Sequence, residues 1–181
     1  MITKLSSQQR DFNTQLSSLL SWESVSNKDV VKTVEEIITS IRSKGDKALI
    51  DYSIKFDGVK VSDMSELTAP SSALKEAFDS LNVNEKTALQ SAADRGHKYH
   101  QKQKQETWTY TEDNGTLLGQ KITPLDRVGL YVPGGKASYP SSVLMNAIPA
   151  KVAGVAELIM VVPTPNGVTN PLVLAAAYIS R

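Results

Sequence analysis

The chain has 181 residues, with 20 lysines and arginines against 19 aspartates and glutamates, and its formal charge is only +1. This balance gives no overall field that would favour nucleic acid or an anionic membrane, so we expect neither as a partner. The absence of cysteine excludes disulfides and the zinc or iron–sulfur sites that need cysteine ligands. The first residues lack the apolar core of a secretion signal and no apolar run is long enough to span a membrane, so we expect a soluble, cytoplasmic protein.

Helical patterns dominate the first half of the chain. Residues 1–25 hold few apolar side chains and are predicted to form an N-terminal arm. The next segment has apolar side chains at helical spacing, and Gly45 ends it: Val30, Val34, Ile37, Ile38 and Ile41. Three further helices are predicted downstream: residues 46–57, the stretch that follows residue 70, and residues 84–105.

The two histidines of the chain, His97 and His100, are three residues apart on the last of these helices and so share one face. Zinc sites in proteins need three or four ligands. The neighbouring residues are mainly lysine and glutamine, and Asp94 is the one carboxylate within a turn. We therefore expect ordinary surface histidines and no zinc bound to this chain.

A β-hairpin is predicted after the helices. Residues 107–111 alternate as a strand does, Asp113-Asn-Gly115 is a strong turn signal, and residues 117–123 form the returning strand. We place a domain boundary between residues 126 and 127.

The stretch from Val128 to Lys136 indicates a ligand site. A short apolar strand ends there in Pro133-Gly-Gly135, and Ser141 or Ser142 is expected to cap a helix just beyond. Free backbone N–H groups at a glycine turn and the positive end of a helix dipole together favour a phosphate or pyrophosphate. A purely structural role, in which the glycines only permit a tight turn, stays open. Standard nucleotide motifs are absent, because a Walker A loop would need a hydroxyl side chain at Ala137 and G-x-G-x-x-G does not occur.

The rest of the chain is predicted to alternate between helix and strand. The helix after the glycine turn should be broken or kinked near Pro149 and end at Gly154, and an apolar strand follows at residues 157–162. Asn170 followed by Pro171 is a strong start signal for the last helix. Because residues 128–181 carry only four charged side chains, we expect this region to be largely buried.

The predicted fold class is α/β: N-terminal helices plus a β-hairpin, followed by the start of an incomplete Rossmann-like α/β/α unit. The expected divisions are an arm at 1–25, a helical region with the hairpin at 26–126, and the start of a cofactor-binding domain at 127–181. A parallel sheet of two strands leaves both of its edges open. We therefore expect the isolated chain to be a poorly autonomous fold.

Several motifs, taken in order, closely resemble the histidinol dehydrogenase family. They are Arg42–Leu49, Lys55-Phe-Asp57, Val128-Gly-Leu-Tyr-Val-Pro-Gly-Gly135, Ser141–Met145 and Val161-Val-Pro-Thr-Pro165. The resemblance covers essentially the whole chain and implies the N-terminal part of a homodimeric, cytoplasmic or plastid enzyme with two incomplete Rossmann-like domains. Such enzymes oxidise L-histidinol to L-histidine through the aldehyde in two NAD-dependent steps, with a zinc ion holding the substrate.

The same resemblance implies the cofactor residues. Tyr131 matches the family tyrosine that contacts NAD, and Pro133, Gly134 and Gly135 line the same pocket. The family's zinc ligands, catalytic residues and substrate contacts lie beyond position 181. No catalytic or metal residue is therefore assigned, and the chain alone is expected to be inactive.

Two other interpretations stay open at the level of sequence. One is a self-standing module that binds a phosphate or nucleotide at the glycine turn, or pairs with another chain through its helices. The other is a related dehydrogenase that acts on another small hydroxylated substrate, since such enzymes are similar over these motifs.

Overall fold

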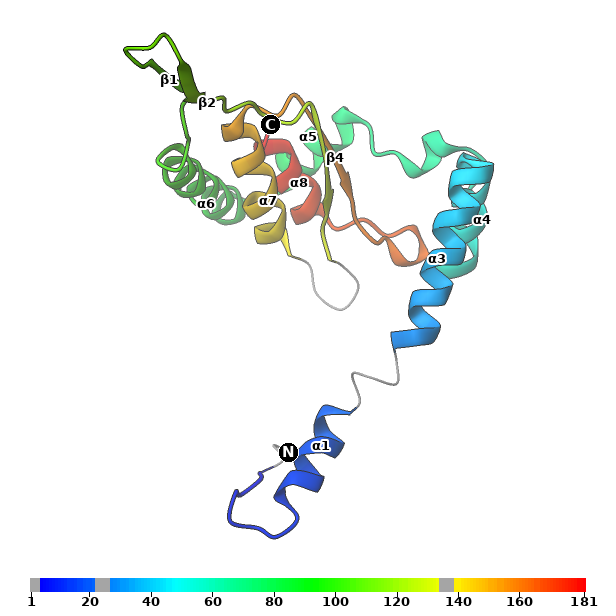
Figure 1. Ribbon diagram of the computed structural model, residues 1–181. Helices are drawn as coiled ribbons and strands as arrows, with labels where there is room; N and C mark the ends of the chain where they lie inside the picture. The colour runs from blue at the N-terminus through cyan, green and yellow to red at the C-terminus, as the bar shows by residue number, and fades with distance from the viewer. Residues whose placement is uncertain (1–3, 22–26, 134–138) are drawn as a thin grey trace. The chain divides into compact units, whose positions relative to one another are not determined.

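The computed structural model describes residues 4–21, 27–133 and 139–181 (Figure 1). The chain forms two compact units, Met1–Ser53 and Ile54–Arg181, each with its own internal contacts. No helix in the described ranges is long and apolar enough to cross a membrane.

The first unit is helical. It consists of α1 (Phe12–Leu20), α3 (Asn27–Lys44) and the start of α4 (Asp46–Asp57). Gly45 joins α3 to α4 with a left-handed backbone, φ +60°, which glycine adopts without strain and which the sequence predicts for a helix end.

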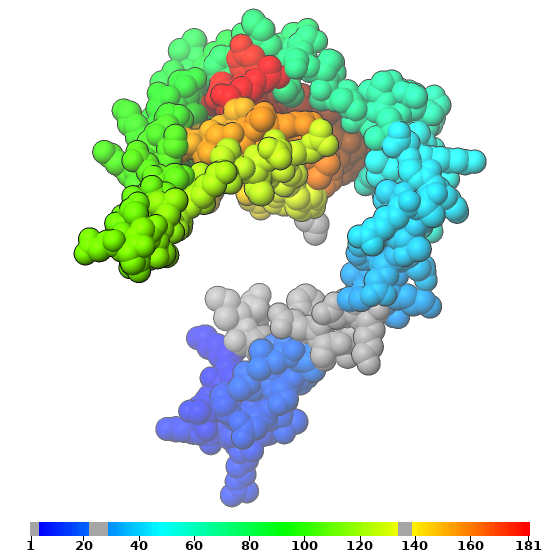
Figure 2. Space-filling view, turned by 45° about the horizontal axis from the view of Figure 1, so that its top comes forward, coloured from blue at the N-terminus to red at the C-terminus, as the bar shows by residue number. Residues whose placement is uncertain are grey.

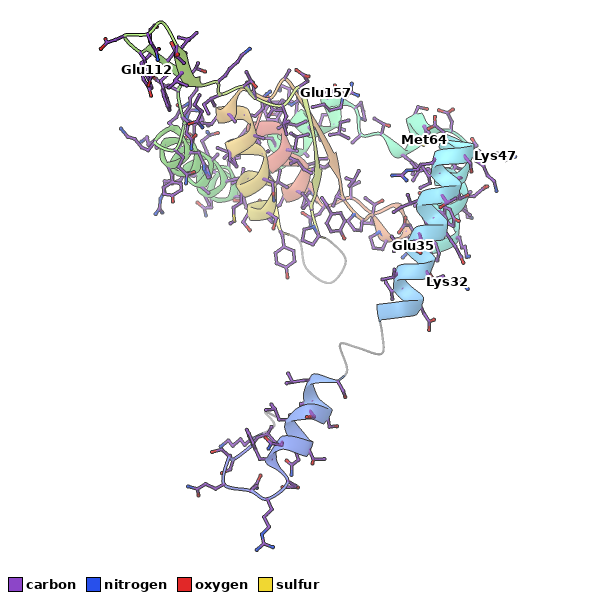
Figure 3. All side chains as sticks on the ribbon, in the orientation of Figure 1. Lys32, Glu35, Lys47, Met64, Glu112 and Glu157 are labelled. Carbon is purple, nitrogen blue, oxygen red and sulfur yellow. The ribbon has the colours of Figure 1, made fainter. Side chains whose placement is uncertain are left out.

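The apolar face expected on α3 is covered only in part. Ile37 and Ile41 are half-buried. Val30, Val34 and Ile38 remain 54%, 46% and 43% exposed. The first unit therefore leaves an apolar strip open along a helix that also carries charged side chains, among them Lys32 and Glu35, which Figure 3 labels.

The second unit contains most of the secondary structure. Its helices after α4 are η1 (Met64–Leu67), α5 (Ser71–Ser80), α6 (Val83–Gln101), α7 (Pro140–Ala153), η2 (Pro165–Gly167) and α8 (Pro171–Ile179). Helix α8 packs on both α5 and α7, and α7 packs also on α6. Figure 2 shows the red end of α8 lying against green and orange segments of this unit. The shared core is apolar, and Val132 and Val143 are its largest fully buried side chains.

Helix ends in this unit follow the sequence signals. The Asn82 side chain accepts a hydrogen bond from the backbone N–H of Glu85 at the start of α6. The Asn170 side chain accepts from the N–H of Leu172 at the start of α8, as expected for Asn before proline. Gly154 ends α7 in the left-handed conformation, φ +97°.

A capping box also orders the short helix η1. Asp63 accepts from the N–H of Ser65 at 2.8 Å, and Glu66 accepts from the hydroxyl of Ser62 at 2.8 Å. These hydrogen bonds favour the ionised carboxylates and lower the pKa of both Asp63 and Glu66. A lowered pKa means that this local stabilisation is present at neutral pH and is lost as the pH falls.

Two separate sheets of two strands occur in the described part of the second unit. Strands β1 (Trp108–Thr111) and β2 (Leu117–Gln120) form the predicted antiparallel hairpin, with Gly115 at φ +86° in the turn. Strands β3 (Arg127–Tyr131) and β4 (Glu157–Val161) pair in parallel through the crossover helix α7. The order of helices, hairpin and β-α-β-α therefore confirms the predicted α/β class.

The parallel register is fixed at both ends of the pair. Arg127 lies opposite Glu157, and their side chains form an ion pair with 2.6 Å between Nε and Oε2. Tyr131 lies opposite Val161 at the other end. A shift of one residue would break the ion pair and turn the buried side chains of β3 to the opposite face.

The predicted domain ranges 1–25, 26–126 and 127–181 stay predictions. Among the described residues, α5 and α6 share one apolar core with α7 and α8. One local expectation differs in part from the structure: α7 is continuous across Pro149, so the predicted alternative of a break is wrong. Proline has no N–H to donate to the carbonyl of Met145, and Met145 is an exposed residue.

Replacing Gly119 by valine should open the hairpin. A Cβ at this position would collide with the backbone oxygen of Trp108 and lie 2.7 Å from Cγ2 of Thr109, so one strand must move. We expect loss of the cross-strand contacts between Tyr110 and Leu118, measured as nuclear Overhauser effects. Gly129→Ala is the control, because a Cβ there meets nothing within 4 Å. Intact contacts in the valine variant would show that the hairpin tolerates the side chain.

Candidate cofactor site

Strand β3 delivers Tyr131 to the carboxyl edge of the parallel sheet. Side chains alternate along a strand, so burial of Leu130 and Val132 directs Tyr131 to the opposite side. The N–H of Val132 donates to the carbonyl of Val161 at 3.0 Å, which extends the pairing one residue beyond the strand. Tyr131 is 65% exposed and Pro133 is exposed as well, and both are held in place by the fully buried Val132 between them.

Helix α7 begins at the same edge. Only the residues from 134 to 138 lie between the described end of the strand segment and Tyr139, the N-cap of α7 (Figure 1). The Tyr139 side chain makes no capping hydrogen bond, and its backbone carbonyl accepts from the N–H of Ser142 at 3.0 Å. Val143 and Leu144 then anchor the first turn in the core. The positive end of the α7 dipole therefore lies at the carboxyl edge of the sheet, where α/β proteins bind ligands.

The structure describes two of the four residues predicted to bind cofactor. Tyr131 and Pro133 lie together at this edge, on the exposed side. Gly134 and Gly135 lie outside the described residues. The predicted caps Ser141 and Ser142 are wrong, since both lie inside α7, which starts one residue earlier because Pro140 favours the first helical position.

Two exposed apolar residues at the edge were not predicted from the sequence. Tyr139 is 46% exposed and Val161 is 57% exposed. The sequence run of β4 predicts burial on both faces, but its residues alternate: Leu158 and Met160 are half-buried, whereas Ile159 and Val161 are exposed. Met160 packs against the apolar core that the helices of this unit share, whereas Ile159 and Val161 alternate to the opposite side. The sequence contained one signal that could have pointed to Tyr139: it stands directly before the proline that begins a helix.

The two histidines lie elsewhere in the second unit. On α6, His97 is exposed and His100 is half-buried; His100 Nδ1 is 2.6 Å from Oε1 of Gln103, and His97 Nε2 is 3.5 Å from Nε2 of Gln101. Over the residues that the structure describes, no three histidine or carboxylate side chains gather as a metal-ligand group.

A depression of about 490 Å³ lies where α6, α7 and α8 end. Its cationic side chains are Lys104, Lys151 and Arg181, each near the carboxyl end of one helix. The carboxyl end of a helix is the negative end of its dipole and favours positive charge. The three cationic side chains are therefore explained without a bound ligand. The depression lies at the opposite end of α7 from Tyr139.

Comparison with known proteins identifies relatives over almost the whole chain. The family model described as histidinol dehydrogenase matches residues 20–181. Histidinol dehydrogenase from Pseudomonas fluorescens is 57% identical over 179 residues, which are 99% of this chain and 40% of that protein. The enzyme of the same name from Neisseria meningitidis is 52% identical over 177 residues, 98% of this chain and 41% of the relative.

A solved structure gives the same result for the fold. The crystal structure of histidinol dehydrogenase from Elizabethkingia anophelis superposes with a TM-score of 0.76 at 28% identity, covering 90% of this chain and 38% of that one. The chain thus spans about 40% of the length of the relatives that it matches.

Proposed function

This chain belongs to the histidinol dehydrogenase family, and we propose that it supplies the N-terminal part of an enzyme that oxidises L-histidinol to L-histidine with NAD. The part that carries this proposal is the carboxyl edge of the β3–β4 sheet. Its one decisive observation is an exposed Tyr131 held rigidly beside the amino end of α7.

The residues at this edge fit a dinucleotide. The aromatic ring of Tyr131 offers a flat apolar surface, and the positive end of the α7 dipole favours the negative charge of a pyrophosphate. When bound, NAD accepts the hydride that the substrate carbon loses in each oxidation. The contribution of this chain is to hold and orient the cofactor, with Tyr131, Pro133, Gly134 and Gly135 as the proposed contacts.

Zinc does not fit the described residues. They contain no three-residue ligand group, so no described residue is proposed as a zinc ligand or as a catalytic residue. We expect the 181-residue chain alone to be inactive, with metal binding and chemistry supplied by the part of the relatives that it does not cover.

A homodimer in the cytoplasm completes the proposal. The exposed strip on α3, made of Val30, Val34 and Ile38, is the kind of surface that a second subunit covers. The names of the relatives favour histidinol over another hydroxylated substrate. Relatedness over 99% of the chain favours part of an enzyme over a self-standing binding module.

Replacing Tyr131 by alanine should weaken NAD binding about 5-fold or more, because its exposed ring is the main contact proposed for the cofactor. Isothermal titration of a full-length family protein that carries residues 1–181 measures this. Tyr131→Phe keeps the ring and should bind NAD nearly as well as the parent. Equal affinity in the parent and the alanine variant, with unchanged circular dichroism, would remove Tyr131 from the cofactor site.

A further inference from the structure

We infer that Asn114, in the turn of the β1–β2 hairpin, is a site of spontaneous deamidation in the folded chain. The sequence contains two Asn-Gly pairs, Asn114-Gly115 and Asn166-Gly167. In such a pair the missing Cβ of glycine lets its backbone nitrogen approach the asparagine side chain closely. The structure treats the two pairs differently, and it favours reaction at Asn114.

The reaction needs a base and water but no enzyme. The backbone nitrogen of Gly115 loses its proton to the base and attacks Cγ of Asn114. The bond from Cγ to Nδ2 breaks, ammonia leaves with a proton from water, and a cyclic imide remains. Water then opens the ring at either carbonyl carbon. The products are aspartate at this position or isoaspartate, in which the main chain runs through the side chain and gains a CH2 group.

The hairpin activates the side-chain carbonyl of Asn114. The backbone N–H of Thr116 donates to Oδ1 of Asn114 at 2.8 Å. This donor draws electron density away from Cγ, and it stabilises the negative charge that develops on Oδ1 during the attack. Asn114 is also an exposed residue, so water reaches the imide and ammonia can leave.

The attacking nitrogen becomes free when one turn hydrogen bond opens. The Gly115 N–H donates to the carbonyl of Glu112 at 2.9 Å. Every residue of β1 and β2 is exposed, and among the described residues these strands pack mainly on each other. An isolated pair of strands is only marginally stable. The hydrogen bond of Gly115 can therefore open without unfolding the core of the second unit.

The second pair is held more firmly. The Gly167 N–H donates to the carbonyl of the half-buried Thr164 at 2.8 Å, and Pro165 between them has a fixed φ. This loop joins β4 to α8. Met160 of β4 packs on the apolar core, and Val173 of α8 belongs to it. Opening the turn at Gly167 therefore disturbs packed elements, and we expect slower reaction at Asn166.

The test compares deamidation of the 181-residue chain in mildly alkaline buffer and in the same buffer with concentrated urea. Peptide mass spectrometry follows the replacement of the side-chain NH2 by OH at each asparagine. The measured quantity is the ratio of the rate at Asn114 to the rate at Asn166, in which general effects of urea on the chemistry cancel. Circular dichroism checks that the sample without urea stays folded.

We expect the ratio to be about 5-fold or more higher in the folded chain than in urea, the factor that one hydrogen bond of about 1 kcal/mol supplies. In urea both pairs are unfolded, so the two rates should be similar. A ratio in the folded chain that is no higher than in urea overturns the inference, because the hairpin would then give Asn114 no advantage.

Asn114→Gln is the matched variant, since its longer side chain cannot close the same ring. The tryptic peptide that spans residues 105–121 also contains Gln105 and Gln120. We expect its change in mass to disappear in Asn114→Gln and to persist in Asn166→Gln. An unchanged gain in mass in Asn114→Gln would place the reaction on another residue of this peptide and would likewise overturn the inference.

Discussion

Replacing Val132 by aspartate should unfold the core of the second unit. Val132 is fully buried where the end of β3 meets the helices, and its side chain belongs to the shared apolar core. An aspartate there would bury a carboxylate without a partner, which costs several kcal/mol. Whole domains are stable by only about 5–15 kcal/mol. We expect loss of the cooperative thermal transition followed by circular dichroism.

Val168→Asp is the control for this experiment. The same side chain is exchanged, but Val168 is 72% exposed and follows η2 on the surface. Surface substitutions of this kind change stability by about 0.5 kcal/mol or less. If Val132→Asp melts at the same temperature as Val168→Asp, Val132 does not lie in a dry core, and the anchoring of Tyr131 would need another explanation.

The isolated 181-residue chain should associate in solution through the open edges of its parallel sheet. Strands β3 and β4 pair only with each other among the described residues, so each keeps one edge of unpaired backbone groups. Exposed Ile159 and Val161 add apolar surface on the face that the helices leave open. Unpaired edges with apolar neighbours recruit other chains. Light scattering after size-exclusion chromatography should show species larger than a monomer at micromolar concentration.

Ile159→Lys should reduce this association, because a charge on an edge strand opposes further pairing. Val168→Lys is the comparison, since it adds the same charge away from the sheet. A clean monomer in which the amides of β3 and β4 exchange as slowly as those of α6 would mean that the edges are already closed, and would contradict the prediction.

Local signals in the sequence predicted most of the elements, because each such signal acts within a few residues. Asn170 before Pro171 starts α8, Gly45 and Gly154 end helices with a left-handed backbone, and Asp113-Asn-Gly115 turns the hairpin. These local signals act through hydrogen bonds and backbone conformations that involve only a few neighbouring residues. The order of the motifs was likewise sufficient to identify the family.

The candidate site was predicted only in part. Tyr131 and Pro133 were named through the resemblance, and the structure places both on the exposed side of the sheet edge. The roles of Gly134 and Gly135 stay predictions.

The sequence by itself determined most of the helices and several of their ends, the hairpin and the family, since propensity, capping and turn chemistry are properties of neighbouring residues. Burial was decided by the tertiary structure. Val132 and Tyr131 are adjacent apolar residues, yet one is fully buried and the other 65% exposed, because the helices cover only one face of a two-stranded sheet. Likewise, Val30 and Val143 both fit apolar helical patterns, but only Val143 has α6 and α8 beside its helix to exclude water.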